Sequence, residues 1–423
     1  MELDVEIREI GARGDGIALL DGGQRLYVPY TTVGDVVRVQ ADSPHTSADR
    51  ARIVQILQPG PGRQQPPCRH FGSCGGCALQ HLDGRHYGAW KAGLLVQALA
   101  QRGIESKEIR AMLAVPAGSR RRAELTAVRR KGDLLLGFNA RASHQVVDLA
   151  ECPVMVLEIV ALMPALRELL FDLLAPAETA EIVATKTDSG LDLLLTSKAA
   201  LGLSLLERLA GFAEAHDLAR LARRDPQSGS SEVLLLRRPV RVRFEDTLVE
   251  LPPGGFLQAT AEGEAALRQA VRKAIGSALH VADLYAGCGT FALPLAAEGR
   301  DVHAIEGDGR LVEAIDRAAR AAAGRLRVRA FARDLTRRPL PVEELDRFDA
   351  VVLDPPRVGA KAQAEALAAS AVPRIAALSC NPATFARDAR ILMDGGYRLE
   401  WVQPIDQFLW SPHLELAAAF RRA

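Results

Sequence analysis

The stretch His280-Val-Ala-Asp-Leu-Tyr-Ala-Gly-Cys-Gly-Thr290 decides the fold of the C-terminal half of the chain. Its first six residues predict a buried strand, and its glycines predict a tight turn into a helix over 291–298. Asp301-Val-His-Ala-Ile-Glu306 predicts the next strand, followed by a long alanine-rich helix. Further strands are expected at 327–331, 348–354 and 373–379. This alternation is typical of a doubly wound parallel sheet, which we expect over residues 251–423.

The glycine turn and the strand ends indicate a nucleotide-like ligand. Gly287-Cys-Gly-Thr-Phe-Ala292 fits a loose G-x-G-x-x-A pattern that NAD, FAD and S-adenosylmethionine sites share. S-adenosylmethionine is favoured by Asp283 before the turn and by Asp354-Pro-Pro-Arg357 after the fourth strand. Either acid could instead serve as a helix cap or a turn residue. An acid at each of four successive strand ends is not expected by chance; the four are Asp283, Glu306, Asp334 and Asp354.

A cysteine occupies the corresponding position after the fifth predicted strand. Ser379-Cys-Asn-Pro382 joins that strand to a helix expected over 383–392. The helix dipole favours a thiolate at such a position, and ligands bind at the carboxyl ends of strands in open α/β sheets. Cys380 is therefore either a nucleophile or a buried structural cysteine, and this stretch alone favours neither.

The composition describes a globular chain of several domains. Its 423 residues are 25% charged and 48% apolar, which suits two to four domains with separate cores. No apolar run has membrane-spanning length and the N-terminus lacks signal-peptide features, so we expect a cytoplasmic protein without membrane contact. The net charge of +1 provides no global basic field, so nucleic-acid binding requires local patches.

Residues 1–57 are predicted to form a small β-barrel. Five short strands with glycine-rich turns suit a closed barrel of the OB type, a fold that often binds oligonucleotides without proving that function. The strands are expected at 3–10, 16–20, 25–28, 35–40 and 51–57. Proline and glycine mark 58–67 as a linker into a central domain, 58–250.

Three cysteines are clustered directly after the linker. Cys68, Cys74 and Cys77 have C-x5-C-x2-C spacing, which places three thiolates on one tight loop, and Cys152 is the candidate for a fourth ligand. In a reducing cytosol this cluster indicates metal binding rather than disulfide bonds. Four thiolates suit zinc or an iron–sulfur cluster, and the spacing does not choose between them.

Two basic segments of the central domain are candidates for phosphate contacts. Residues 120–131 hold six basic side chains against one acid, and a second group comprises Arg237, Arg238, Arg241 and Arg243. Each segment alone is best explained as a solvated face. Beside a barrel and a metal-binding loop, contact with phosphate becomes plausible.

Together the motifs resemble those of the RNA uracil-5-methyltransferase family. The match covers nearly the whole chain and rests on Cys68…Cys74-Gly-Gly-Cys77…Cys152, Asp354-Pro-Pro-Arg357, Ser379-Cys-Asn-Pro-Ala-Thr384 and His413-Leu-Glu415. The chain is most similar to the bacterial 23S ribosomal RNA branch. This resemblance implies a TRAM barrel, a [4Fe-4S] cluster on the four cysteines and a class I methyltransferase domain. It also implies an RNA partner, no obligate protein partner, and a helix near 86–103 packed on the catalytic domain.

The resemblance further implies a role for individual residues. Carbon 5 of uracil is a poor nucleophile, so Cys380 would add to carbon 6 and Glu415 would later remove the proton from carbon 5. The apolar run around Glu415 would raise its pKa, as a base near neutral pH requires; the alternative is a strand-edge carboxylate facing water. The positions that match the family's methyl-donor site are Gln258, Tyr285, Glu306 and Asp354, and Asp334 would reach the adenine end of the donor.

Two segments depart from the family pattern. Tyr285-Ala-Gly-Cys-Gly-Thr290 differs from the usual Phe-Cys-Gly-x-Gly-Asn turn, which leaves the role of Thr290 open. Gln407-Phe-Leu-Trp-Ser-Pro412 lacks the usual Phe-Pro-x-Thr pattern, so the position of Glu415 is less defined than that of Cys380.

Other activities fit the motifs less well. Adenine and cytosine amino methyltransferases use an aromatic residue after Pro-Pro, where this chain has Arg357. DNA cytosine-5 methyltransferases carry their thiolate on the fourth strand, where this chain has Asp354. Two alternatives stay open: the same chemistry on transfer RNA, and a non-catalytic iron–sulfur RNA-binding factor. The presence of both Cys380 and Glu415 argues against the second.

Overall fold

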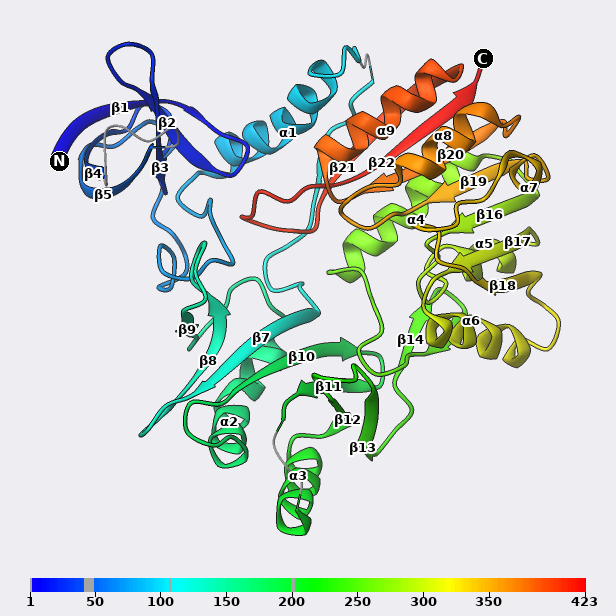
Figure 1. The fold of residues 1–423 in the computed structure, drawn as a ribbon, viewed down its shortest axis with the longest axis horizontal. Coiled ribbons are helices and arrows are strands. Elements are labelled where there is room, and N and C mark those ends of the chain that lie inside the picture. Colours follow the sequence, from blue (N-terminus) through cyan, green and yellow to red (C-terminus); the bar gives the residue numbers. More distant parts are fainter. Residues whose placement is uncertain (1, 42–48, 106–107, 199–201) are drawn as a thin grey trace.

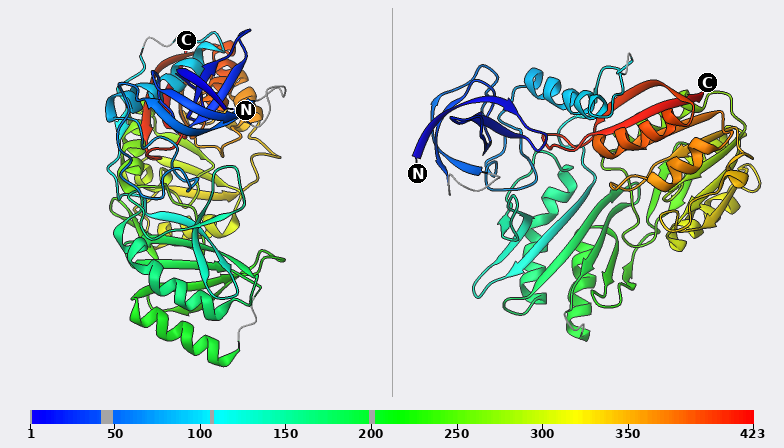
Figure 2. Two further views of the ribbon diagram at one scale, coloured as in Figure 1. Left: turned by 90° about the vertical axis from the view of Figure 1, so that its left-hand side faces the viewer. Right: turned by 45° about the horizontal axis from the view of Figure 1, so that its top comes forward.

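The structure is a computed structural model that describes residues 2–41, 49–105, 108–198 and 202–423. It contains an N-terminal barrel, a central mixed sheet and a C-terminal sheet covered by helices (Figure 1). The two views of Figure 2 place the barrel beside helix α1 and the central sheet at the end away from the C-terminus. Among the described residues, no helix is both long enough and apolar enough to cross a bilayer.

The five strands predicted at the N-terminus are present and close into a barrel. The barrel order is β1-β2-β3-β5-β4, and β4 pairs with β1 to close it. Alternate residues point inward, so Ile7, Leu26, Val28, Val37 and Val39 are fully buried. Residues 42–48 of the predicted barrel lie outside the described residues. The strands are β1 (Glu2–Ile10), β2 (Asp15–Leu19), β3 (Arg25–Pro29), β4 (Val36–Ala41) and β5 (Asp49–Gln58).

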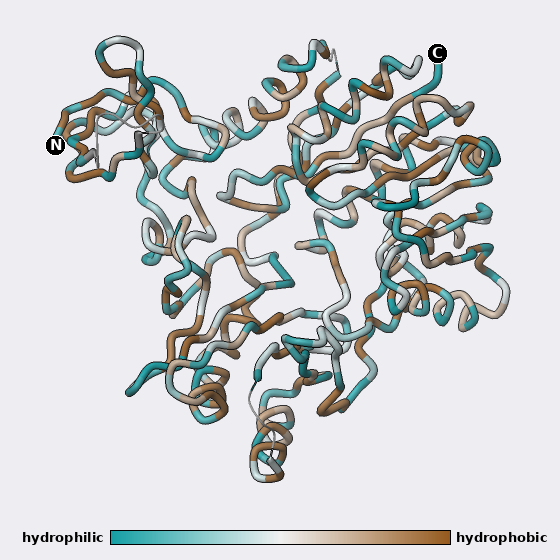
Figure 3. Tube along the Cα trace, viewed as in Figure 1, coloured by the Kyte–Doolittle hydropathy of each residue, from teal (hydrophilic) through white to brown (hydrophobic). Residues whose placement is uncertain are grey.

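The central region is a seven-stranded sheet in the order β13-β12-β11-β10-β7-β8-β9. Two leucine-rich helices, α2 (Leu157–Leu173) and α3 (Leu203–Ala215), pack against it and appear largely brown in Figure 3. A two-stranded hairpin of β14 (Arg241–Phe244) and β15 (Thr247–Glu250) follows the sheet. The sheet strands are β7 (Arg122–Arg129), β8 (Leu134–Asn139), β9 (Val146–Asp148), β10 (Thr179–Thr187), β11 (Gly190–Thr196), β12 (Leu218–Arg224) and β13 (Ser231–Leu236).

The C-terminal region confirms the predicted parallel sheet. The order is β18-β17-β16-β19-β20-β22-β21-β6, in which the first five strands are parallel and β22 is antiparallel to both neighbours. The strands are β16 (His280–Leu284), β17 (Asp301–Glu306), β18 (Val328–Ala332), β19 (Ala350–Leu353), β20 (Arg374–Ser379), β21 (Tyr397–Asp406) and β22 (Glu415–Arg422).

Helices cover both faces of this sheet because alternate strand residues point to opposite sides. Val281 and Val352 share a core with α4, α5 and α6, whereas Leu284 and Val351 share a core with α1, α8 and α9. The carboxyl ends of the parallel strands are thereby left free to form a site. The helices are α4 (Ala261–Ile275), α5 (Ala292–Ala297), α6 (Gly309–Ala321), α7 (Val342–Leu345), α8 (Lys361–Ala369) and α9 (Pro382–Asp394).

A segment from the first quarter of the chain is built into the C-terminal sheet. Helix α1 (Gly84–Ala100) packs against α9 and contributes Leu95 and Leu99 to the same core. Strand β6 (Leu113–Ala114) adds an edge strand parallel to the end of β21. Helix α1 and strand β6 therefore belong structurally with a sheet whose other strands begin at His280.

Candidate active site

The turn after β16 is shaped to hold a ligand against the sheet. Tyr285, Gly287 and Gly289 have φ angles of +62°, +57° and +90°. A Cβ on Gly289 would lie 2.8 Å from Leu293, so only glycine lets the turn pack this closely on α5. The Gly287 amide donates to Glu306 Oε2 at 2.9 Å, which fixes that carboxylate at the end of β17.

A cavity of about 550 Å³ opens above the carboxyl ends of the parallel strands. Most of the predicted site residues line it together; these are Gln258, Tyr285, Glu306, Asp354, Cys380 and Glu415. Thr290, whose role the sequence leaves open, also lines the cavity. Asp334 does not: its carboxylate accepts from the backbone amides of Thr336 and Arg337 in its own turn.

Cys380 is positioned between β20 and the first turn of α9. The side chain of Asn381 caps this helix by accepting from the amide of Ala383 at 3.1 Å. The helix dipole, which favours a thiolate at this position, is opposed by burial. Burial raises the pKa of the Cys380 thiol to about 11, and the charges of Glu415 and Asp354 add to that increase.

Glu415 is the first residue of β22 and is buried inside the sheet. Because β22 lies between β20 and β21, the alternative of a strand-edge carboxylate facing water is wrong. Only 4% of Glu415 is exposed, and its Oε2 accepts from Gln407 Nε2 at 2.9 Å. Burial raises the pKa of Glu415 to about 8, and the nearby charge of Asp354 acts in the same direction.

Two glutamine amides connect Glu415 to Asp354. Gln407 Nε2 also donates to Gln258 Oε1 at 2.8 Å, and Gln258 Nε2 donates to Asp354 Oδ2 at 3.3 Å. Desolvation raises the pKa of Asp354 to about 7. Gln407 follows β21 directly and was not identified from the sequence, although its segment departs from the family pattern. The two carboxyl groups thus lie at the ends of one hydrogen-bonded chain.

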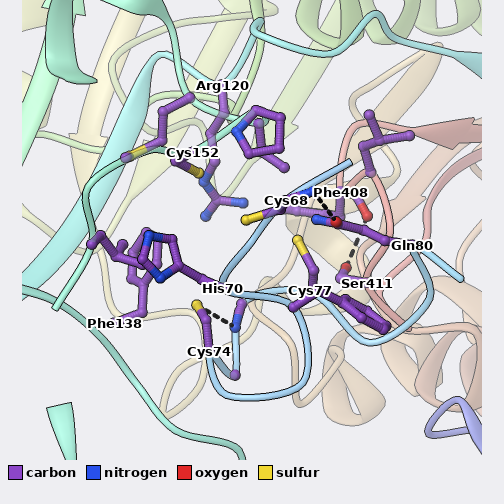
Figure 4. Close-up of a pocket in the computed structure, with 18 of the residues that line it drawn as sticks. Cys68, His70, Cys74, Cys77, Gln80, Arg120, Phe138, Cys152, Phe408 and Ser411 are labelled. Carbon is purple, nitrogen blue, oxygen red and sulfur yellow. Dashed lines mark hydrogen bonds between the residues drawn. The ribbon is translucent and has the colours of Figure 1, made fainter. Parts of the chain in front are cut away.

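The predicted cysteine ligands face a second cavity of about 420 Å³ (Figure 4). Cys68, Cys74 and Cys77 come from the loop after the barrel, and Cys152 comes from the segment after β9. The two segments are tied together where the amide of Arg69 donates to Glu151 Oε1 at 2.9 Å. The sequence separates Cys152 widely from the other three, and the fold brings all four to one space.

The four thiols do not form a site for a single ion. Within the described ranges, no three potential ligand side chains are arranged to hold one metal ion. A tetrahedral zinc site, with zinc–sulfur bonds of about 2.3 Å, requires sulfurs only about 4 Å apart. The cysteines of the described chain are free thiols. A metal centre on these residues therefore stays a prediction, and its support is the shared cavity.

The cysteine loop contacts the segment that carries Glu415. The amides of Ala78 and Leu79 donate to the carbonyl of Trp410 at 2.9 and 3.1 Å. Trp410 has a φ of +58°, a left-handed conformation that is costly for a bulky residue. In Figure 1 this segment is the red loop between β21 and β22, which extends toward the middle of the molecule.

The two cavities also share part of their lining. Arg120, Arg122 and Phe408 contribute to both. Arg120 extends among the cysteines in Figure 4, and Phe408 lies on the opposite side, beside Gln80. Some aromatic and apolar residues that line the cavity of about 550 Å³, which we call the donor cavity, were not identified from the sequence, because no local pattern marks them. They are Phe256, Phe291, Leu311 and Phe408.

Several arginines of the two basic segments have partners within the protein. Arg121 is paired with buried Glu264, and Arg129 stacks on the ring of Phe171. Arg237 and Arg238 both pair with Asp217. Much of the positive charge in these segments is therefore paired with residues elsewhere in the chain.

Comparison with known proteins connects this geometry to a family. A sequence model described as tRNA (uracil-5-)-methyltransferase matches residues 239–423. An uncharacterised RNA methyltransferase of Brucella suis is 45% identical, over 99% of this chain and 97% of its own length. The 23S rRNA (uracil(1939)-C(5))-methyltransferase of Halomonas elongata is 33% identical, over 97% of this chain and 88% of its own.

A solved structure shares the whole fold. The tRNA (uracil-54, C5)-methyltransferase of Pyrococcus abyssi, in complex with S-adenosyl-L-homocysteine, aligns with a TM-score of 0.76 at 23% identity and covers 99% of both chains. Likeness at that identity shows the fold, and the full-length relatives show the family. The chain belongs to the S-adenosylmethionine-dependent RNA (uracil-5-)-methyltransferase family.

Proposed function

We propose that this enzyme methylates carbon 5 of a uridine in 23S ribosomal RNA through a covalent adduct with Cys380. The observation that carries the proposal is that Cys380, Asp354 and Glu415 line one cavity beside the glycine turn. Similarity to the Halomonas elongata enzyme along nearly the whole chain supports the ribosomal substrate.

The first step is addition of Cys380 to the uracil ring. Cys380 gives up its proton to water. Water reaches the thiol because Cys380 also lines a separate groove of about 200 Å³. Its Sγ then bonds to carbon 6 and the electron pair of the C5–C6 double bond moves onto the ring as an enolate. Carbon 5 takes the methyl group as the methyl–sulfur bond of the donor breaks, which leaves S-adenosylhomocysteine.

Glu415 completes the reaction. Its carboxylate removes the proton from carbon 5, the C5–C6 double bond forms again, and Cys380 leaves as a thiolate. A carboxylate with a pKa of about 8 binds a proton much more strongly than an exposed glutamate, which suits this role. Water is kept from Glu415 by its burial within the sheet.

The remaining cavity residues hold the methyl donor. Glu306, fixed by the amides of Gly287 and Asp308, accepts from the ribose hydroxyls. Gln258 and Asp354 lie between the donor and the base, and Tyr285 forms part of the cavity wall. Asp334, at the edge of its own turn, reaches the adenine end only after its local hydrogen bonds change.

The four cysteines hold a [4Fe-4S] cluster in this proposal. Thiolates are the ligands that such clusters require, and Cys68, Cys74, Cys77 and Cys152 all line one cavity. The cluster would supply a structural link between the loop after the barrel and the segment near Cys152. Its presence is tested by iron and sulfide analysis of anaerobically purified protein.

Three parts of the chain share the work on RNA. A TRAM-like barrel (1–57) and a central domain (58–250) hold the folded RNA, and the catalytic domain (251–423), completed by α1, takes a flipped uridine. Such an enzyme works in the cytoplasm, where ribosomes assemble.

The experiment is nucleoside mass spectrometry of ribosomal and transfer RNA from a strain that lacks this gene. Loss of 5-methyluridine from one mapped 23S fragment, restored by the wild-type gene but not by Cys380→Ala, is the expected result. Loss from transfer RNA alone would replace the substrate and keep the chemistry; the Pyrococcus abyssi fold makes that the second candidate. No loss from either RNA would favour a non-catalytic RNA-binding factor.

A further inference from the structure

Gln407 is a buried amide at the centre of the hydrogen-bonded chain between the two carboxyl groups. Only 2% of it is exposed. Its Nε2 donates to Glu415 Oε2 at 2.9 Å and to Gln258 Oε1 at 2.8 Å, so both of its N–H groups are used. Among the described residues, its Oε1 has no hydrogen-bond donor. An amide with an unsatisfied buried oxygen is costly, so the contacts of Nε2 must maintain its orientation.

The first turn of α4 holds this amide in place. Gly263 lies so close that a Cβ there would be 2.9 Å from both Cβ and Oε1 of Gln407. The amide of Gly263 itself donates to Thr260 Oγ1, which caps the helix. If the Gln407 amide were reversed, Oε1 would face Oε1 of Gln258 and an oxygen of Glu415, which only accepts once the carboxyl group is ionised. The packing and the hydrogen bonds therefore select one orientation, in which Gln407 is a donor.

We propose that Gln407 is a positioning residue for the proton-removal step, whose amide orients the Glu415 carboxylate and connects it through Gln258 to Asp354. The inference rests on the proposed function, in which Glu415 is the base. A donor to a carboxylate stabilises the ionised form, so Gln407 keeps Glu415 available as a base inside a site whose burial opposes ionisation. Gln407 does not line the donor cavity, so it acts through Glu415 and not on the substrate.

The test replaces the amide with a side chain of similar length. Gln407→Met removes both hydrogen bonds. Gln403→Met is the matched control, because Gln403 lies on β21, the strand that leads into Gln407, and donates to Ala111 O away from the cavity. Single-turnover methylation is measured from pH 6 to about 10 with the RNA substrate. We expect the rise of the methylation rate with pH to move to higher pH by about one unit in Gln407→Met, which corresponds to about a tenfold higher proton affinity of Glu415. The profile of the control should stay unchanged.

Covalent trapping provides a second readout. If Gln407 serves the proton-removal step, Gln407→Met should accumulate the Cys380–RNA adduct at pH 7, seen as a band of slower mobility in denaturing gels. A purely structural role would lower both adduct and product and leave the pH limb in place. The proposal would be overturned if the methylation rate of Gln407→Met rose over the same pH range as that of the wild type.

A milder variant covers the case in which Gln407→Met does not fold. Gly263→Ala retains the amide but pushes it with a new Cβ, and alanine is favourable in a helix. We expect a shift in the same direction and smaller; no shift would overturn the proposal. Failure of the proposed function looks different, since the wild-type protein would then form no 5-methyluridine in any RNA. If the wild-type protein turns over and the pH profiles of the variants are not shifted, only the role of Gln407 is excluded.

Discussion

The two cavities share a wall but differ in how their polar groups are satisfied. In the catalytic cavity, Asp354 and Glu415 are linked through two amides, so each carboxyl group has a partner within the protein. In the cysteine cavity, four cysteines line a common space, and the amide of Gly76 donates to Cys74 Sγ at 3.4 Å. The first cavity brings the predicted catalytic residues together, whereas a metal centre in the second stays a proposal. The loop contacts at Trp410 connect the two.

The largest expected effect separates chemistry from binding within the catalytic cavity. Cys380→Ala should lower methyl transfer by at least about 10⁴-fold, because no other group replaces the nucleophile. Binding of S-adenosylmethionine, measured by calorimetry, should stay within a few-fold of the wild type. Loss of donor binding as well would show that Cys380 supports the cavity rather than the reaction.

A smaller loss is expected at Glu415. Glu415→Gln should slow product formation by about 10²- to 10⁴-fold, because general-base catalysis is removed while Cys380 can still attack. The covalent RNA adduct should therefore accumulate, in contrast to Cys380→Ala, which forms none. Denaturing gels with labelled RNA measure both, and rapid turnover by Glu415→Gln would place the base elsewhere.

The pH dependence distinguishes the buried carboxyl groups from exposed ones. The wild-type rate should rise by at least about tenfold from pH 6.5 to 8 as Glu415 ionises, and ionisation of the Cys380 thiol acts in the same direction. The folded pKa of Glu415 is raised, so its contribution to stability is present below pH 4.5 and is lost as pH rises toward 8. Glu415→Gln should thus have a Tm about 3 °C or more above the wild type at pH 8, with the difference vanishing at pH 4.5.

The cysteine cavity is tested by removing one thiol. Cys77→Ser should lose iron and visible absorbance, while Cys288→Ser, a buried cysteine outside that cavity, should retain both. Methylation should fall by about tenfold, because loosening the loop weakens the two hydrogen bonds to Trp410. Full iron content in Cys77→Ser would exclude this residue as a ligand.

The smallest effect on function is expected for Arg122, which lines both cavities. Arg122→Gln should weaken RNA binding by a few-fold and reduce the slope of log affinity against log salt by about one, as for the loss of one phosphate contact. Arg129→Gln is the matched control, since its guanidinium stacks on Phe171 and donates to Phe171 O. Equal slopes for both variants would remove Arg122 from the RNA-binding surface.

Features that depend on neighbouring residues could be predicted from the sequence. The parallel strands are short buried runs, and parallel strands place their carboxyl ends along one edge, so Glu306, Asp354 and Cys380 were expected together. The barrel was likewise expected from the spacing of its strands. The resemblance to a family added Gln258 and Glu415, which lie on other elements and which no strand-end argument would bring to the cavity.

Features that depend on partners far away in the sequence could not be predicted from it. Asp334 does not line the cavity, and its Oδ1 accepts from two amides of its own turn, so its assignment to the donor site stays a prediction. The helix dipole suggested a thiolate at Cys380, and the opposing charges of Asp354 and Glu415 come from other strands. The charge of Arg121 is taken by Glu264, far along the chain. Gln407 gains its importance only from Gln258, which the fold places beside it.

The position of α1 and β6 in the C-terminal domain has a consequence during synthesis. A ribosome releases α1 and β6 hundreds of residues before Ile405 and Asp406, their partners in the finished sheet. At about 5–20 residues per second, the apolar side chains of Leu95 and Leu99 wait on the order of tens of seconds for their core. The nascent catalytic domain therefore matures last, and any message truncated before β22 yields a chain with an exposed helix for chaperones and proteases to recognise.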